Sequence, residues 1–146
     1  MKIYITRHGE TDWNAVGRVQ GRIDTEINEV GRKQAQDLAA ELKSIGIDRI
    51  VASTLKRSGQ TAAIIADVLG VPIQNDERLR ECAFGEFEGM LLSEREEKYG
   101  EKISGYFTDE AEPYSFSVCG GEDRESVLSR HVELLNDLKM GASIHF

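Results

Sequence analysis

The sequence predicts an α/β fold with a mostly parallel central sheet flanked by helices. The alternation of strand and helix signals leads to this class, and two further observations define the helix ends and the number of domains. Short runs rich in β-branched and aromatic residues alternate along the chain with longer stretches of helical periodicity. A glycine follows each of the first two long helical stretches, at Gly46 and Gly70, as is typical of a helix end. No repeat, low-complexity run or linker interrupts residues 1–146, so we expect a single domain.

Three short segments are predicted to form the strands. Residues 2–6 combine β-branched and aromatic side chains and predict a buried strand, and residues 49–52 form a second short apolar run. Residues 71–74 predict a third strand of marginal stability, because Pro72 has no amide N–H to donate to a ladder.

Helices are predicted at residues 29–44, from an N-cap at Ser53 or Thr54 to residue 69, and at residues 122–138. A short acidic helix at 93–99 lies within a loop-rich region at 75–120. Apolar residues at helical spacing predict the buried faces: Ala35, Leu38, Leu42 and Ile45 in the first helix, Ala62, Ile65 and Leu69 in the second, and Val127, Leu134, Leu135 and Leu138 in the last.

The composition restricts location and partners. A net charge of -8 at pH 7 argues against a nucleic-acid partner and against an anionic membrane surface. No apolar run approaches the roughly 20 residues that span a bilayer, and the chain passes into its first strand without a signal-peptide pattern. Cys82 and Cys119 have neither metal-ligand nor disulfide-framework spacing, so we expect two free thiols and a cytoplasmic protein.

Arg7 and His8 follow the first predicted strand directly, and Gly9 comes next. In open α/β sheets ligands bind beyond the carboxyl ends of the strands, so this is a favoured place for chemistry. An arginine there suits a phosphate or a carboxylate, and a histidine suits a nucleophile or a general base. Taken alone, the motif could equally be a surface Arg-His pair at the end of a strand.

The whole pattern resembles the histidine phosphatase superfamily, the phosphoglycerate-mutase-like enzymes. The resemblance covers residues 1–139, and the matching stretches keep the family's order: 7–11 with Trp13 and Asn14, 20–27, 28–35, 53–62, 79–89, and 120–122 with Val127 and Arg130. Family members continue into another central strand that ends in a second catalytic histidine. That segment is missing here, so the domain is expected to be C-terminally incomplete. His145 is the one candidate replacement, and it follows the last helix too closely.

The resemblance implies catalytic roles for four residues. His8 matches the nucleophile that becomes a phosphohistidine, Arg7 and Arg57 match the phosphate-binding arginines, and Glu81 matches the proton donor. Two guanidinium groups stabilise a transferring phosphoryl group without a metal, so we expect no metal and no cofactor. Arg57 taken alone would be a solvated charge on a helix.

Glu81 carries an alternative interpretation as an ordinary exposed carboxylate. Its proposed acidity depends on desolvation beside Phe84 and Phe87, and Glu86 and Glu88 are the weaker candidates for the acid.

The substrate contacts are assigned by the same resemblance. Asn14 would donate its amide to the phosphate, and Gln20 with the backbone of Gly21 would contact phosphate or substrate. Asn and Gln in loops also commonly just close turns. Cys82 is better explained as a small buried hydrophobe than as a redox group, and His131 as a surface residue.

The function implied is hydrolysis of small phosphomonoesters through a phosphohistidine intermediate, impaired in this short chain. The compact sequence around the acid motif favours a phosphatase over a cofactor-dependent phosphoglycerate mutase. A vestigial phosphate-binding domain without catalysis is the further alternative. The expected partner is a small phosphorylated metabolite.

The missing strand would leave one edge of the strand at 2–6 unpaired. Residues 141–146 could fold back as a substitute strand, a second copy could cover the edge in a homodimer, or the chain could be a fragment.

Overall fold

The computed structural model describes residues 2–99 and 115–141. Helices and two strands alternate along these ranges, in this order: α1 (Asp12–Ala15), α2 (Glu29–Leu42), β1 (Ile50–Ala52), α3 (Lys56–Leu69), β2 (Ile73–Asn75), α4 (Leu92–Tyr99) and α5 (Arg124–Gly141). Short 3-10 turns connect them at η1 (Glu77–Leu79), η2 (Gly85–Phe87) and η5 (Ser117–Cys119). The α/β class is confirmed, and so are the four main predicted helices, to within a few residues at their ends.

β1 and β2 form a parallel pair in which Ile50 lies opposite Ile73. Pro72 lies just before β2, and its carbonyl accepts a hydrogen bond of 3.0 Å from the Ile50 amide. A proline tolerates this position because only its carbonyl is used there. The two strands predicted at 49–52 and 71–74 are therefore present, each shifted toward its C-terminal end.

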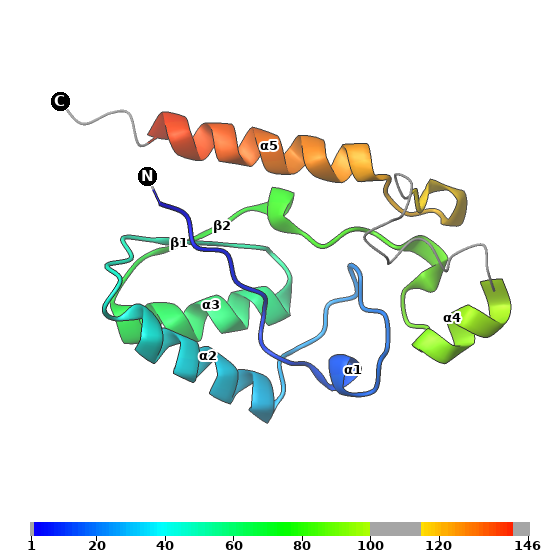
Figure 1. Cartoon of the computed structure of the whole chain (residues 1–146), viewed down its shortest axis with the longest axis horizontal. Coiled ribbons are helices and arrows are strands. Elements are labelled where there is room, and N and C mark those ends of the chain that lie inside the picture. The colour runs from blue at the N-terminus through cyan, green and yellow to red at the C-terminus, as the bar shows by residue number, and fades with distance from the viewer. Residues whose placement is uncertain (1, 100–114, 142–146) are drawn as a thin grey trace.

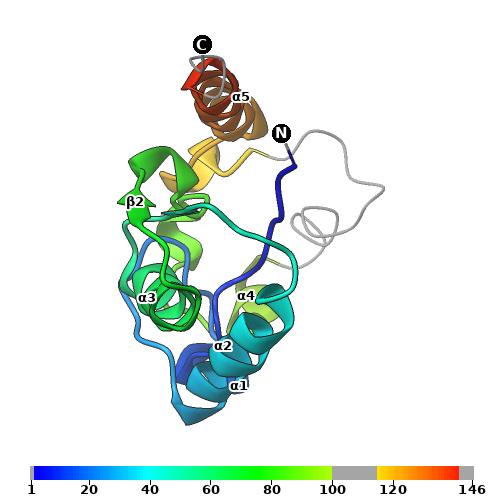
Figure 2. The same ribbon diagram turned by 90° about the vertical axis from the view of Figure 1, so that its left-hand side faces the viewer.

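The helices lie on both sides of this small sheet. α3 packs against both strands and also against α2. Figure 1 and Figure 2 show α2 and α3 on one side of the strands and α5 on the other, with α4 beyond the end of the sheet. α5 packs against η1. Arg78 of η1 forms an ion pair with Asp137 of α5 at 2.6 Å and another with Asp76, just before η1, at 2.8 Å.

The strand predicted at residues 2–6 is not present: the segment is an irregular trace (Figure 1) without a strand assignment. Its apolar side chains are exposed, to 46% at Ile3, 52% at Tyr4 and 91% at Ile5. The prediction of a buried strand was wrong because β propensity describes the fit of a side chain to a sheet, and a strand needs a hydrogen-bonded neighbour. Within the described ranges no strand pairs with this segment.

The buried face of α2 is narrower than predicted. Gly31, Ala35 and Ala39 are buried at spacings of one helical turn, while Ile45 lies beyond the helix and is 41% exposed. Small residues bring the helix close to its neighbours. A Cβ on Gly31 would lie 2.3 Å from the carbonyl oxygen of Glu10, so glycine is required where residues 9–10 cross the helix.

α3 begins with a tertiary cap. Its N-cap residue is Leu55, which has no capping side chain, and Asp24 accepts a hydrogen bond of 2.7 Å from the Lys56 amide instead. The prediction of Ser53 or Thr54 as the N-cap was wrong, because an acceptor distant in sequence took the place of a local one. Gly70 ends the helix as predicted, in the left-handed conformation.

α5 buries little of its predicted face. Leu134 is 3% exposed, but Leu135 is 39% exposed. Leu128 and Val132, on the same side of the helix as Leu135, are 50% and 52% exposed. A separate aromatic cluster joins the loop at 82–90, before α4, to residues 116–119, before α5. Phe87 and Phe116 are almost completely buried in it, with ring centroids 5.9 Å apart in an edge-to-face arrangement.

Candidate active site

A cavity of about 750 Å³ is bordered by the end of the N-terminal segment, the loop after α1, the start of α3 and the loop after η1. Every site residue expected from the sequence lines it: Arg7, His8, Asn14, Gln20, Gly21, Arg57 and Glu81. These side chains come from distant parts of the chain, so the tertiary fold brings them together.

Side chains from two helices hold the segment that carries His8. The Gly9 amide donates to the Thr61 hydroxyl of α3 at 2.9 Å, and the Glu10 amide donates to Gln34 of α2 at 2.9 Å. A Cβ on Gly9 would lie 2.5 Å from the carbonyl oxygen of Gly31, so the backbone passes tightly over the start of α2. His8 is therefore placed by this anchored turn, although residues 2–6 before it form no strand.

The His8 ring has a defined tautomer. Its Nδ1 lies 2.7 Å from the carbonyl oxygen of Gly9, and because a carbonyl only accepts, Nδ1 carries the proton. Burial lowers the pKa of His8, and the charges of Arg57 and Arg7 lower it further, against the opposing effects of Gly9 and Glu81. The ring is thus neutral at neutral pH, with the lone pair on Nε2.

Arg57 lies in the first turn of α3 and is 2% exposed. Its guanidinium donates to the carbonyl oxygens of Ile23 at 3.0 Å and of Gly21 at 2.7 Å. Its Nε–H is buried without a partner in the described part of the chain. Arg57 therefore holds the 20–23 loop and keeps a further donor, whereas Arg7 is exposed.

Gly21 adopts a positive φ of 52°, and a Cβ there would lie 2.3 Å from a carboxylate oxygen of Glu88. The neighbouring Gln20 is 7% exposed, and its side-chain oxygen accepts from Thr25 and, at 2.8 Å, from Thr11. With this oxygen engaged, the amide NH₂ is the part of Gln20 that can donate to a ligand.

Asn14 is engaged in a similar way. Its side-chain oxygen accepts from the Thr11 amide at 3.1 Å, and Thr11 caps α1 in return. The Asn14 NH₂ group is left as a donor on a residue that lines the cavity.

Glu81 lines the cavity, but its surroundings differ from those expected. The side chain is exposed, and Phe87 is fully buried in the aromatic cluster and does not line the cavity. The prediction that Phe84 and Phe87 desolvate this carboxyl was therefore wrong, because Glu81 is exposed and the Phe87 ring lies in the core. One carboxylate oxygen of Glu81 accepts from the Cys82 amide at 2.9 Å.

The two weaker candidates for the acid are engaged elsewhere. One oxygen of Glu88 accepts from the amides of Arg22 at 3.1 Å and Phe84 at 3.0 Å. Glu86 accepts from the Tyr99 hydroxyl at 3.1 Å. Neither residue lines the cavity.

Phe84 lines the cavity, as the sequence suggested. The sequence assigned no site role to the other residues that line it: Glu10, Gly17, Arg18, Val19, Gln34 and Arg95. Arg18 lies 5.6 Å from the centre of the Trp13 ring and donates to the Gly89 carbonyl. Arg95 is a charged residue only 9% exposed, on a helix that otherwise looked merely acidic. No spacing signal distinguished these arginines from surface charges.

Other expectations concern residues outside the cavity. Burial raises the pKa of the Cys82 thiol to about 11, with help from Glu122 and Glu81, and this agrees with a small buried hydrophobe. His131 is half-buried beside Arg130, so its description as a surface residue was incomplete. His145 lies outside the described residues.

Two features are absent from residues 2–99 and 115–141. No group of His, Cys, Asp and Glu there has the arrangement of a metal site. No helix in these ranges has both the length and the apolar character needed to cross a membrane.

The sequence model of the histidine phosphatase superfamily (branch 1) matches residues 3–143. The chain belongs to this superfamily. Phosphoserine phosphatase 1 of Hydrogenobacter thermophilus is 37% identical over 139 residues, which are 95% of this chain and 64% of that protein. A Yersinia pestis protein named probable phosphoglycerate mutase GpmB is 39% identical over 109 residues, 72% of this chain and 51% of the relative.

Solved structures of superfamily proteins have the same fold. Mycobacterial glucosyl-3-phosphoglycerate phosphatase, in a structure described as a complex with VO3, matches with a TM-score of 0.80 and 32% identity over 92% of this chain and 63% of that one. Bacillus stearothermophilus YhfR matches with a TM-score of 0.78 and 29% identity over 95% of this chain and 67% of that one. The chain spans less than two thirds of both sequence relatives and of the mycobacterial structure.

Proposed function

We propose that this protein is a phosphatase that hydrolyses small phosphomonoesters through a phosphohistidine on His8. The observation that carries the proposal is the His8 ring, which donates from Nδ1 to Gly9 and is kept neutral by burial and by two arginines. An imidazole in this state has a free Nε2 lone pair beside groups that attract a phosphate. Two of the relatives are named as phosphatases, which supports the same activity.

The first half-reaction forms the intermediate. His8 Nε2 attacks phosphorus, the bond from phosphorus to the leaving oxygen breaks, and Glu81 delivers its proton to that oxygen. Arg7 and Arg57 stabilise the charge on the equatorial oxygens, and the Asn14 and Gln20 amides and the Gly21 backbone orient the phosphate.

The second half-reaction regenerates the protein. Water attacks phosphorus and gives its proton to the Glu81 carboxylate, while the bond from phosphorus to Nε2 breaks. The products are inorganic phosphate and neutral His8.

The arginines take the part that a metal plays in other phosphoryl-transfer sites, so we propose that turnover needs no metal and no cofactor. Full activity in EDTA is the expected result. Activity that disappears in EDTA and returns with magnesium or zinc would overturn this mechanism.

The test of the proposed function uses p-nitrophenyl phosphate and rapid-quench mass spectrometry. Wild type is expected to release p-nitrophenol and phosphate and to carry a phosphoryl group on His8, and His8→Ala to do neither. His131→Asn is the matched control, because it removes the half-buried histidine of α5, and it is expected to behave as wild type.

Two other outcomes would favour the alternatives. Conversion of 3-phosphoglycerate to 2-phosphoglycerate faster than phosphate release would support a mutase, which one relative's name suggests. A rise in melting temperature with vanadate, without any turnover, would support a phosphate-binding domain.

We further propose that residues 1–146 act as one cytoplasmic domain without a nucleic-acid partner, and that a second copy covers the exposed segment at 2–6. The net charge of -8 supports the absence of a nucleic-acid partner, and the exposure of Ile5 at 91% supports the contact with a second copy. Light scattering is expected to give a dimer that Ile5→Lys dissociates. A monodisperse wild-type monomer would exclude the dimer.

A further inference from the structure

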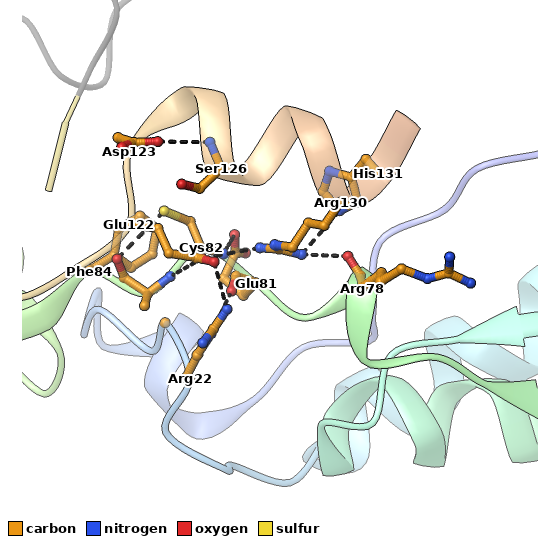
Figure 3. A network of polar contacts seen from close by, with 12 residues as sticks. Arg22, Arg78, Glu81, Cys82, Phe84, Glu122, Asp123, Ser126, Arg130 and His131 are labelled. Atoms are coloured by element: carbon orange, nitrogen blue, oxygen red, sulfur yellow. Dashed lines mark hydrogen bonds and ion pairs between the residues drawn. The ribbon is translucent and has the colours of Figure 1, made fainter. Parts of the chain in front are cut away.

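Glu122 lies just before α5, and its carboxylate contacts three separate segments of the chain (Figure 3). One of its oxygens accepts from the Arg22 guanidinium at 2.8 Å. The other accepts from the Ala83 amide at 2.9 Å and from the Arg130 guanidinium at 3.2 Å. The Glu122 amide in turn donates to the Ala83 carbonyl at 2.8 Å, so Ala83 is held through both of its backbone groups.

The network is well shielded from solvent. The side chains of Glu122 and Arg130 are 19% and 14% exposed, and that of Arg22 is 34% exposed. Burial alone would raise the pKa of Glu122, but the Ala83 amide and the Arg130 and Arg22 charges hold it below its ordinary value. Glu122 is therefore an anion at neutral pH, and its hydrogen bonds are charge-assisted.

Through Arg22, these contacts connect Glu122 to the backbone of Glu81 and to the loop held by Arg57. Arg22 Nε donates to the carbonyl oxygen of Glu81 at 3.3 Å. Arg22 follows Gly21, whose carbonyl is held by Arg57. The acid loop at 81–83 and the substrate loop at 20–23 are thus tied to each other through one carboxylate, with Arg57 bound to the far end of the substrate loop.

Capping of α5 does not explain Glu122, because the neighbouring Asp123 performs that task. Asp123 accepts from the Ser126 amide at 2.7 Å, the contact expected of an N-cap side chain. The Glu122 side chain points the other way, toward Arg22 (Figure 3), and accepts from the Ala83 amide.

We propose that Glu122 is a positioning residue for the proton donor: with Arg22 it holds the backbone of residues 81–83 so that the Glu81 carboxyl meets the leaving oxygen. The inference rests on the proposed function and adds a residue to it. Glu122 does not line the cavity, so it acts through Glu81.

A positioning residue for the acid should matter most when the leaving group needs a proton. Phenyl phosphate and p-nitrophenyl phosphate have nearly the same shape, but phenolate is much the more basic leaving group. In Glu122→Gln we expect kcat/KM to fall by about tenfold or more for phenyl phosphate and by about threefold or less for p-nitrophenyl phosphate, as partial loss of general-acid catalysis predicts. A merely structural role would lower both values equally.

Two further variants complete the experiment. Glu125→Gln removes an exposed carboxylate three residues along and is expected to leave both values unchanged. Arg22→Lys keeps a charge beside Glu122 but loses the Nε donor to Glu81, so it should show the same asymmetry. It carries the test if Glu122→Gln does not fold.

The outcomes separate this inference from the proposed function. Equal losses with both esters, or no loss, in folded Glu122→Gln and Arg22→Lys would overturn the positioning role while the phosphatase stands. Absence of phosphate release from wild type with both esters would overturn the proposed function, and the positioning role with it.

Discussion

The loops around the cavity are held differently from two exposed apolar surfaces, namely residues 2–6 and the side of α5 that carries Leu128, Val132 and Leu135. Around the cavity, each loop is anchored by side chains from other segments, such as Thr61 on Gly9 and Glu122 on Ala83. On the two apolar surfaces, Ile5 is 91% exposed and Val132 is 52% exposed. The comparison teaches that specific polar partners can fix the position of a loop, whereas side chains suited to a strand form no strand without a hydrogen-bonded neighbour.

The largest expected effect separates the two arginines of the site. Arg7→Met and Arg57→Met should each lose at least about 3 kcal/mol of transition-state stabilisation, the scale for one oxyanion donor. The sequence places neither arginine in the core periodicity, which predicts that variants of both remain folded. Because Arg57 is 2% exposed and holds two carbonyls, Arg57→Met should also lower the melting temperature, whereas Arg7→Met should not. Kinetics and thermal denaturation of both variants check this, and equal melting temperatures would contradict the loop-holding role.

The second prediction compares neighbouring leucines on α5. Leu134 is 3% exposed and Leu135 is 39% exposed. Leu134→Ala should cost about 2–5 kcal/mol of unfolding free energy, and Leu135→Ala about 0.5 kcal/mol or less. Urea denaturation measures both values. A large cost at Leu135 would show that its side of α5 is covered in solution, for example by a second copy.

The third prediction compares glycines within helices. Gly31→Ala places a Cβ 2.3 Å from the Glu10 carbonyl oxygen and should destabilise the fold by about 1–3 kcal/mol. Gly59→Ala enters open space in α3 and should stabilise it by about 0.5–1 kcal/mol, since alanine is the better helix former. Denaturant midpoints decide the signs. If Gly31→Ala were neutral, the tight crossing that anchors His8 would not exist.

The smallest expected effect is a pH dependence at His8. Burial and the charges of Arg57 and Arg7 lower its pKa below the ordinary 6.5, so in this pH range the unfolded chain binds the proton more readily than the folded one. The stability linked to His8 is then fully present above pH 6.5 and decreases as the pH falls below it. NMR titration of the ring should give a midpoint under 6.5, and His8→Asn should lose stability less steeply on acidification. A midpoint above 6.5 would contradict the neutral nucleophile.

The sequence by itself determined the features that depend on local chemistry. The periodicity of the long helices, the glycine at position 70 and the family motifs around His8, Arg57 and Glu81 could all be recognised in one chain. Those motifs also indicated which residues line the cavity, because each follows a predicted strand or begins a helix. Helical periodicity and helix ends depend on neighbours in sequence, so they are legible without a structure.

Only the tertiary structure decided what depends on distant partners. Residues 2–6 have the side chains of a strand but no strand beside them, and Leu135 has the spacing of a core residue on a face that nothing described covers. Phe87 is in the core and does not line the cavity, and Glu122 joins two loops that no spacing connects. The physical reason is common to these cases: burial and hydrogen bonding belong to pairs of groups, and a sequence shows only one member of each pair at a time.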